Sequence, residues 1–132
     1  MSEHGKSTFD MDANLVALLC YLANFVCYLG LILSIITVIQ DKDNKLARFH
    51  AFQSIFLTVL AIVLIPVYFI VGFIGGMIDS ALGFPILSLL MFLIVAVIGL
   101  ALFVFMVLAA IKGFGGEMYK IPVIGNIAEK YV

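Results

Sequence analysis

One charged stretch, Gln40–Ser54, interrupts the apolar sequence and carries polar side chains that could take part in binding or catalysis. His50 and Gln53 are three residues apart, so they share one face of a helix. Together with Arg48 and two residues near the C-terminus, they form a candidate recognition patch on the cytoplasmic side for a protein or a lipid headgroup. The residues of this patch are Arg48, His50, Gln53, Glu117 and Tyr119.

A structural role for the same side chains is the alternative. Arg48 would extend to phosphate headgroups, as long basic side chains do at membrane surfaces. His50 and Gln53 would then tie the charged loop to the C-terminal tail, with Glu117 as a partner.

The residue types do not favour catalysis. His50 has no cysteine or cluster of carboxylates nearby in the sequence, so neither a nucleophilic triad nor a metal site is indicated. Cys20 and Cys27 are separated by roughly 10 Å on a helix, which exceeds the reach of a disulfide. We therefore expect no catalytic, metal or cofactor-binding residues, and we expect that the protein is not an enzyme.

Small and weakly polar residues recur at helical spacing in the first apolar run. Such a stripe lets a neighbouring helix approach closely in a membrane, and a polar lining for a transport path is the alternative. The residues of this packing stripe are Cys20, Ala23, Asn24, Cys27, Gly30 and Ser34, with Thr37 continuing it.

The composition indicates the elements that hold these residues. Hydrophobic residues make up 65% of the 132-residue chain and charged residues 11%, whereas soluble domains carry about 45–50% and about 25%. The bilayer is therefore the expected solvent, and no basic surface suggests nucleic-acid binding. We predict an all-α integral membrane protein.

Three transmembrane helices are expected, at about 15–39, 50–71 and 86–111, within a transmembrane domain over 13–112. Residues 1–12 are expected to form a flexible extracytoplasmic tail. Residues 113–132 are expected to form a cytoplasmic tail with a short segment lying on the membrane surface.

The distribution of cations predicts the orientation. Three spans would place Lys6 on one side and six cations on the other, and short loops rich in cations face the cytoplasm. The N-terminus would lie outside and the C-terminus inside the cell membrane. The six cations are Lys42, Lys45, Arg48, Lys112, Lys120 and Lys130.

Two groups of residues resemble a family of small prokaryotic membrane proteins of unknown function. The first is Asp43-Asn44-Lys45 with Arg48-Phe49-His50-Ala51 and Gln53-Ser54, and the second is Gly116-Glu117, Tyr119-Lys120-Ile121-Pro122, Ile124-Gly125 and Glu129-Lys130. That family is described as related to the twenty-kilodalton subunit of the chloroplast inner-envelope translocon (Tic20). The resemblance implies a helical membrane protein in a larger assembly, without catalytic residues.

The sequence thus favours a structural or interaction subunit of a membrane assembly, with a link to protein translocation or insertion implied by the resemblance. Its partners would be the lipid bilayer and other membrane subunits or further copies of itself. The alternative is a homo-oligomeric channel or passive transporter lined by Asn24, Ser34 and Thr37.

Overall fold

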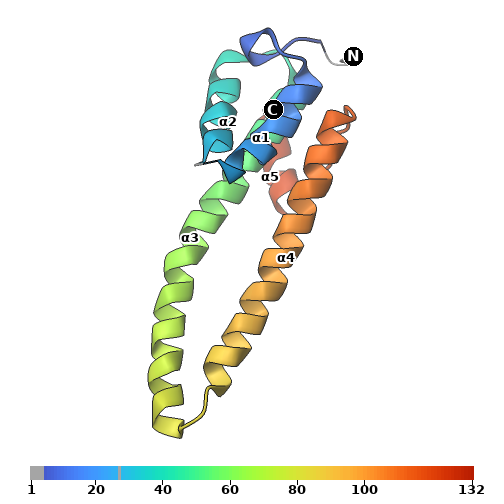
Figure 1. The fold of residues 1–132 in the computed structure, drawn as a ribbon. Coiled ribbons are helices and arrows are strands. Elements are labelled where there is room, and N and C mark those ends of the chain that lie inside the picture. Colours follow the sequence, from blue (N-terminus) through green and yellow to red (C-terminus); the bar gives the residue numbers. More distant parts are fainter. Residues whose placement is uncertain (1–4, 27) are drawn as a thin grey trace. The chain divides into compact units, whose positions relative to one another are not determined.

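The computed structural model describes residues 5–26 and 28–132, and most of this sequence is helical (Figure 1). It divides into a terminal unit, Met1–Thr58 with Phe105–Val132, and a central unit, Val59–Val104. The helices are α1 (Ala13–Leu22), α2 (Leu29–Gln40), α3 (Lys45–Leu82), α4 (Ile86–Phe114) and α5 (Ile124–Glu129), with short 3₁₀ turns η1 (Thr8–Asp10) and η2 (Ala23–Phe25).

The first apolar run is two short helices, and the expectation of one continuous helix over 15–39 is wrong. η2 follows α1, and Tyr28 adopts a left-handed conformation with φ 60° before α2 begins. At 1.5 Å per residue the two helices measure about 15 and 18 Å, so neither crosses a hydrocarbon core of about 30 Å. α1 and α2 lie side by side in the terminal unit (Figure 1).

Glycine makes this close approach of α1 and α2 possible. A Cβ atom added at Gly30 would lie 2.6 Å from both the Asn24 amide nitrogen and the Cys20 carbonyl oxygen. No side chain fits such a distance, because non-bonded carbon atoms prefer separations of about 3.5–4.0 Å. Gly30, a member of the packing stripe, therefore packs against Cys20 and Asn24 of the same chain.

The segment that precedes α1 lies beside the loop that follows α2. The Ser7 hydroxyl donates a hydrogen bond to the Asp41 carboxylate, and the Asn44 side-chain amide donates to the Lys6 carbonyl at 3.4 Å. Residues in contact cannot lie on opposite sides of a bilayer. From the sequence, the N-terminal tail and the charged loop are expected on opposite sides of the membrane, whereas the structure has Lys6 and Ser7 in contact with this loop.

α3 and α4 are the long apolar helices, and both are long and apolar enough to cross a membrane. α3 has 38 residues and α4 has 29, which correspond to about 57 and 44 Å. α3 continues past the predicted end near Gly72 as far as Leu82, and α4 starts at the predicted Ile86. Among the described residues the structure has two such helices where the sequence suggested three.

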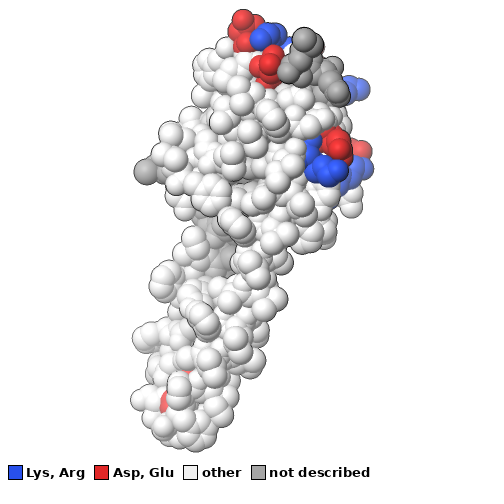
Figure 2. All heavy atoms as spheres, turned by 45° about the vertical axis from the view of Figure 1, so that its right-hand side comes forward, with Lys and Arg blue, Asp and Glu red and all other residues white. Residues whose placement is uncertain are grey.

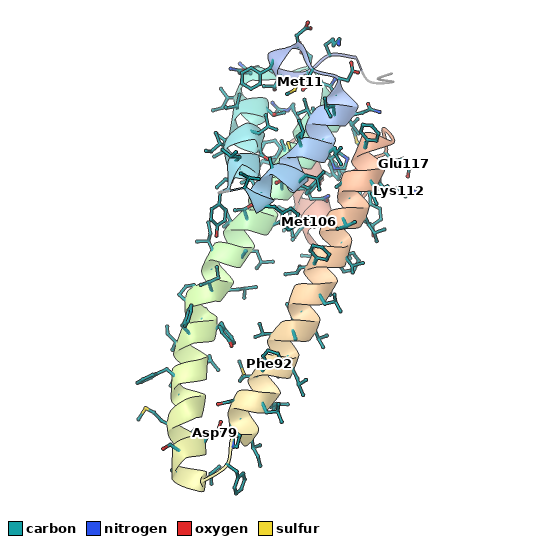
Figure 3. All side chains as sticks on the ribbon, in the orientation of Figure 1. Met11, Asp79, Phe92, Met106, Lys112 and Glu117 are labelled. Atoms are coloured by element: carbon teal, nitrogen blue, oxygen red, sulfur yellow. The ribbon has the colours of Figure 1, made fainter. Side chains whose placement is uncertain are left out.

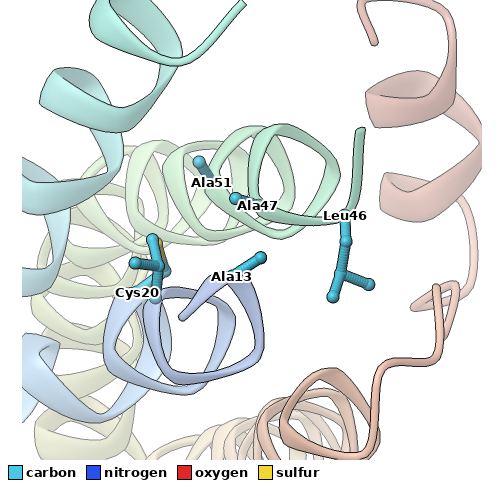
Figure 4. Close-up of a cluster of buried hydrophobic side chains, with 6 residues drawn as sticks. Ala13, Cys20, Leu46, Ala47 and Ala51 are labelled. Carbon is cyan, nitrogen blue, oxygen red and sulfur yellow. The ribbon is translucent and has the colours of Figure 1, made fainter. Parts of the chain in front are cut away.

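Mostly small side chains line the contact between α1 and α3 in the terminal unit. Ala13 and Cys20 of α1 face Leu46, Ala47 and Ala51 in the first turns of α3 (Figure 4). These side chains are fully buried, and their small size lets the two helix backbones come close together. The contact positions α1 beside the polar residues of α3.

Candidate functional site

A buried polar network lies next to this core. His50 and Gln53, on α3, are both 0% exposed, and so is Tyr21 on α1. The Tyr21 hydroxyl is 2.9 Å from His50 Nδ1 and accepts a hydrogen bond from Gln53 Nε2 at 2.8 Å. The i, i+3 spacing of His50 and Gln53 places both beside the same tyrosine, as their sequence positions predict.

The backbone of the C-terminal tail completes the network. His50 Nε2 lies 2.9 Å from the Glu117 carbonyl oxygen. Gln53 Nε2 donates to the Tyr119 carbonyl at 3.1 Å, and the Ile121 amide donates to Gln53 Oε1 at 3.0 Å. The side chains of His50 and Gln53 therefore bind the backbone of three tail residues, which are Glu117, Tyr119 and Ile121.

The geometry defines the protonation state of the histidine. A carbonyl oxygen can only accept a hydrogen bond. His50 Nε2 must therefore carry a proton and donate to the Glu117 carbonyl. Nδ1 then accepts a hydrogen bond from the Tyr21 hydroxyl. The same hydroxyl oxygen accepts a hydrogen bond from Gln53, so its own proton is available for His50. A neutral imidazole in this tautomer satisfies each polar atom of the three side chains.

A glycine on α4 lies directly against the histidine. A Cβ atom at Gly113 would be 3.1 Å from His50 Nε2 and 3.1 Å from the Ala17 Cβ atom. Nearby, the Asn14 side-chain amide donates to the Phe114 carbonyl at 2.9 Å. The end of α4 is thus held against α1 and α3 at the point where the tail begins.

Arg48 binds backbone oxygen atoms within the terminal unit. Its guanidinium donates to the Val38 carbonyl at 3.0 Å, to the Asp41 carbonyl at 3.3 Å and to the Tyr131 carbonyl at 3.2 Å. Its Cζ atom also lies 5.5 Å from the centre of the Phe52 ring. A cation at the last turn of α2 is favourable because the carbonyl end of a helix carries partial negative charge.

The five residues of the candidate recognition patch therefore have different environments. His50 and Gln53 are buried, Glu117 is exposed, and its carboxylate forms an ion pair with Lys112 at 3.0 Å (Figure 3). Glu117 and Tyr119 meet the network through their backbone oxygens. His50 and Gln53 could bind a partner only after the C-terminal tail had separated from them.

A second set of hydrogen bonds joins α3 to the connection between α1 and α2. The Asn24 side-chain amide donates to the hydroxyls of Ser54 at 3.1 Å and Thr58 at 3.3 Å. The Ser54 hydroxyl donates to the Cys20 carbonyl at 2.6 Å. This carbonyl lies near the end of α1, where the helix itself supplies few donors.

The structure places the packing stripe inside the terminal unit. Cys20, Gly30 and Ser34 are buried, whereas Ala23 and Asn24 are half-buried. The Ser34 hydroxyl donates to the Gly30 carbonyl at 2.6 Å, within its own helix. Cys27 lies outside the described residues.

Sequence reasoning did not identify Tyr21 or Gly113 as members of the site. A tyrosine within an apolar run was the available signal for Tyr21, because a buried hydroxyl needs a partner. No local signal distinguished Gly113 from the other glycines that follow it. In the described part of the chain, no group of three histidine, cysteine or acidic residues could hold a metal ion.

Comparison with known proteins relates the chain to archaeal membrane proteins. A UPF0132 membrane protein of Methanocaldococcus jannaschii is 32% identical over 131 residues, covering 96% of this chain and 94% of that protein. A second from the same organism is 32% identical over 121 residues, covering 92% and 71%. One of Archaeoglobus fulgidus is 28% identical over 124 residues, covering 92% and 97%. No solved structure matches the chain.

The relatives and the apolar helices together identify a membrane protein in contact with the lipid bilayer. The expected membership of a membrane-protein family without an assigned function is confirmed, while the relation to the chloroplast translocon subunit stays a prediction. The sequence profile described as "Magnetosome magnetite crystal formation protein family" matches residues 12–128. Because this match covers most of the chain, the protein belongs to the magnetosome magnetite crystal formation protein family.

Proposed function

We propose that the protein is a non-catalytic structural or interaction subunit of a membrane assembly. The observation that supports this most is the closed network of Tyr21, His50 and Gln53. The side chains of Tyr21, His50 and Gln53 are buried, and they bind one another and the tail backbone. Their arrangement holds the terminal unit together and leaves no polar atom of these three side chains free for a reacting group.

In the proposed topology, α3 and α4 form one hairpin in the membrane, with both termini in the cytoplasm. The contacts of residues 6 and 7 with the loop at 41–44 support one common side for the N-terminal segment and this loop. All seven lysines and arginines belong to the terminal unit, and Figure 2 shows charged side chains gathered there. Loops rich in cations favour the cytoplasmic side, here of the cell membrane.

A homo-oligomeric channel is the alternative, and the side chains proposed to line it give it less support. The hydroxyls of Ser34 and Thr37 are buried, and each donates to a carbonyl one turn earlier in α2. Asn24 binds Ser54 and Thr58. A polar path would need these groups to face water.

The family name refers to magnetite crystal formation, whereas the names of the archaeal relatives say only that they are membrane proteins. A membrane subunit that organises other components would be consistent with both. A role in protein translocation or insertion rests on the resemblance to the translocon family alone.

The test is the composition of the native complex. A tagged chain, expressed at its native level and extracted gently, would be analysed by native mass measurement and protein identification. A defined complex with other membrane proteins is expected. A pure homo-oligomer would favour the channel, and a lone monomer would contradict the proposed function.

A paired substitution would locate the interaction. Lys42 and Lys45 are exposed on the charged loop, so Lys42→Gln with Lys45→Gln should reduce recovery of the partners if this loop is recognised. Lys120→Gln with Lys130→Gln removes the same charge from the C-terminal tail and serves as the matched control. An equal loss of partners in both double variants would indicate attraction to the overall positive charge instead of recognition of the charged loop.

A further inference from the structure

The turn between α3 and α4, at the end of the central unit, has an unusual surface for a loop. Leu82, Phe84 and Ile86 are exposed, with the Phe84 side chain at 52%. We propose that this turn is an interaction surface for lipid acyl chains and remains within the hydrocarbon region of the bilayer. This inference goes beyond the proposed function and holds whether or not the protein has subunit partners.

Charge is the first argument for a lipid environment. Asp79 is the only acidic or basic residue between Val59 and Val104, and it is 8% exposed. Its carboxylate accepts hydrogen bonds from the backbone amides of Leu87 at 2.9 Å and Ser88 at 2.7 Å. The single charge thus caps the start of α4, near the turn (Figure 3), and its residue is largely buried.

The backbone of the turn supplies the second argument. Polar backbone groups inside a bilayer need partners within the protein, because no water is available there. The Gly83 amide donates to the Asp79 carbonyl at 2.9 Å, and the Ile86 amide to the Phe84 carbonyl at 3.0 Å. Pro85 has no amide proton, and Asp79 receives the next two amides of α4.

The distribution of exposed side chains favours lipid over a protein partner. Tyr68, Phe69, Ile70 and Val71 are successive residues of α3, and all four are exposed. Four successive residues point in all directions around a helix, since each turn holds 3.6 residues. A helix that is apolar on every side is typical of a membrane span, whereas a protein partner would cover one stripe.

Length permits the turn to stay inside the bilayer. The uncharged sequence at 51–78 corresponds to about 42 Å of helix, and that at 86–111 to about 39 Å. Both exceed the hydrocarbon thickness of about 30 Å, and helices accommodate such an excess by tilting. Tilting keeps the apolar turn in lipid, whereas an upright pair would push Leu82 and Phe84 into water.

The chain contains no tryptophan, so a single tryptophan can report on the turn without background. Phe84→Trp would be incorporated into nanodiscs, whose two faces are both accessible, with acyl chains brominated at known depths. Phe92→Trp, within α4, is the control for hydrocarbon, and Phe9→Trp, in the exposed N-terminal segment of the terminal unit, is the control for water.

We expect lipid bromines to quench Phe84→Trp as they quench Phe92→Trp, and aqueous iodide to quench it several-fold less than Phe9→Trp. Iodide quenching equal to that of Phe9→Trp would overturn the proposal. Protection from both quenchers would overturn it as well, because the turn would then be covered by protein, such as a second copy of the chain.

A second measurement covers the case in which Phe84→Trp does not fold. Leu82→Cys, in a background with Cys20→Ala and Cys27→Ala, would be labelled in nanodiscs with an impermeant maleimide. Lys45→Cys on the exposed charged loop is the control for water. We expect several-fold slower labelling of Leu82→Cys, and equal rates would contradict the proposal.

Discussion

At the residue scale, the buried network depends on side chains that satisfy one another completely. Gln53 is its centre, because its amide group contacts Tyr21, the Tyr119 carbonyl and the Ile121 amide. A buried polar group that loses its partner keeps the full penalty of having left water. Removing the Gln53 amide would therefore weaken the contacts of α3 with both α1 and the C-terminal tail.

Gln53→Leu should lower the free energy of unfolding by about 1–2 kcal/mol, since it leaves the Tyr119 carbonyl and the Ile121 amide without their partner and removes one of the two hydrogen bonds of the Tyr21 hydroxyl. The measurement is denaturant unfolding in detergent micelles, with limited proteolysis of the tail as a second readout. Gln40→Leu, at an exposed position, should change neither. Unchanged stability of Gln53→Leu would show that the network does not hold the tail.

Two glycines provide a steric test of the same unit. Gly113→Ala brings a Cβ atom to 3.1 Å from His50 Nε2, and Gly30→Ala brings one to 2.6 Å from backbone atoms. Overpacking of this kind costs about 1–3 kcal/mol, and Gly30→Ala should be the more harmful because backbone cannot move aside. Thermal unfolding should rank the two variants in that order.

Gly99→Ala is the matched control, because no atom lies within 4 Å of the added Cβ position. Alanine favours a helix over glycine by about 1 kcal/mol, so this variant should be as stable as the native chain or more stable. A loss of stability for Gly99→Ala equal to that for Gly113→Ala would show that the loss at Gly113 does not come from its close contact with His50.

At the element scale, the sequence predicted the long helices better than the short ones. α4 begins at Ile86, the residue at which the last span is predicted from the sequence to start, and the sequence from there to Ile111 is uncharged. The run at 15–39 is also uncharged, but a break within it separates α1 from α2. Hydropathy records the apolar surroundings of a segment, whereas the break depends on contacts with α3 that are distant in sequence.

The conformation of Tyr28 makes this break testable. Its φ of 60° lies in the left-handed region, which costs a non-glycine residue about 1 kcal/mol or more. Tyr28→Gly should therefore retain or increase thermal stability, whereas Tyr28→Val should reduce it because branching at Cβ adds strain. If both variants lose stability equally, the tyrosine side chain matters more than the backbone conformation.

The candidate site was predictable only in part, because the sequence shows local spacing but not contacts between residues that are distant in sequence. The spacing of His50 and Gln53 indicated a shared face, and their contact with the tail was one of the two alternatives. The partners of His50 and Gln53 in the tail could not be predicted from residue types. The tail contributes backbone atoms, which every residue has. Burial of both side chains follows only once α1 and the tail are packed on α3.

At the scale of the whole molecule, the proposed topology makes a simple prediction. A short epitope added before Met1 and one added after Val132 should both be accessible from the cytoplasmic side, since a hairpin of α3 and α4 returns the chain to its starting side. Protease protection in right-side-out and inverted vesicles would measure this. Accessibility of the two epitopes from opposite sides would restore an odd number of crossings and contradict the proposed topology.

The contacts between His50, Gln53 and the tail also bear on how the protein is made. The ribosome completes α1 and the first turns of α3 long before it synthesises Glu117, Tyr119 and Ile121, which are 66 to 68 residues from their partners. Until then the two side chains lack the tail groups that satisfy them in the folded unit. A chain that stops before Ile121 lacks these partners, so the terminal unit can reach its full stability only after the tail has been synthesised.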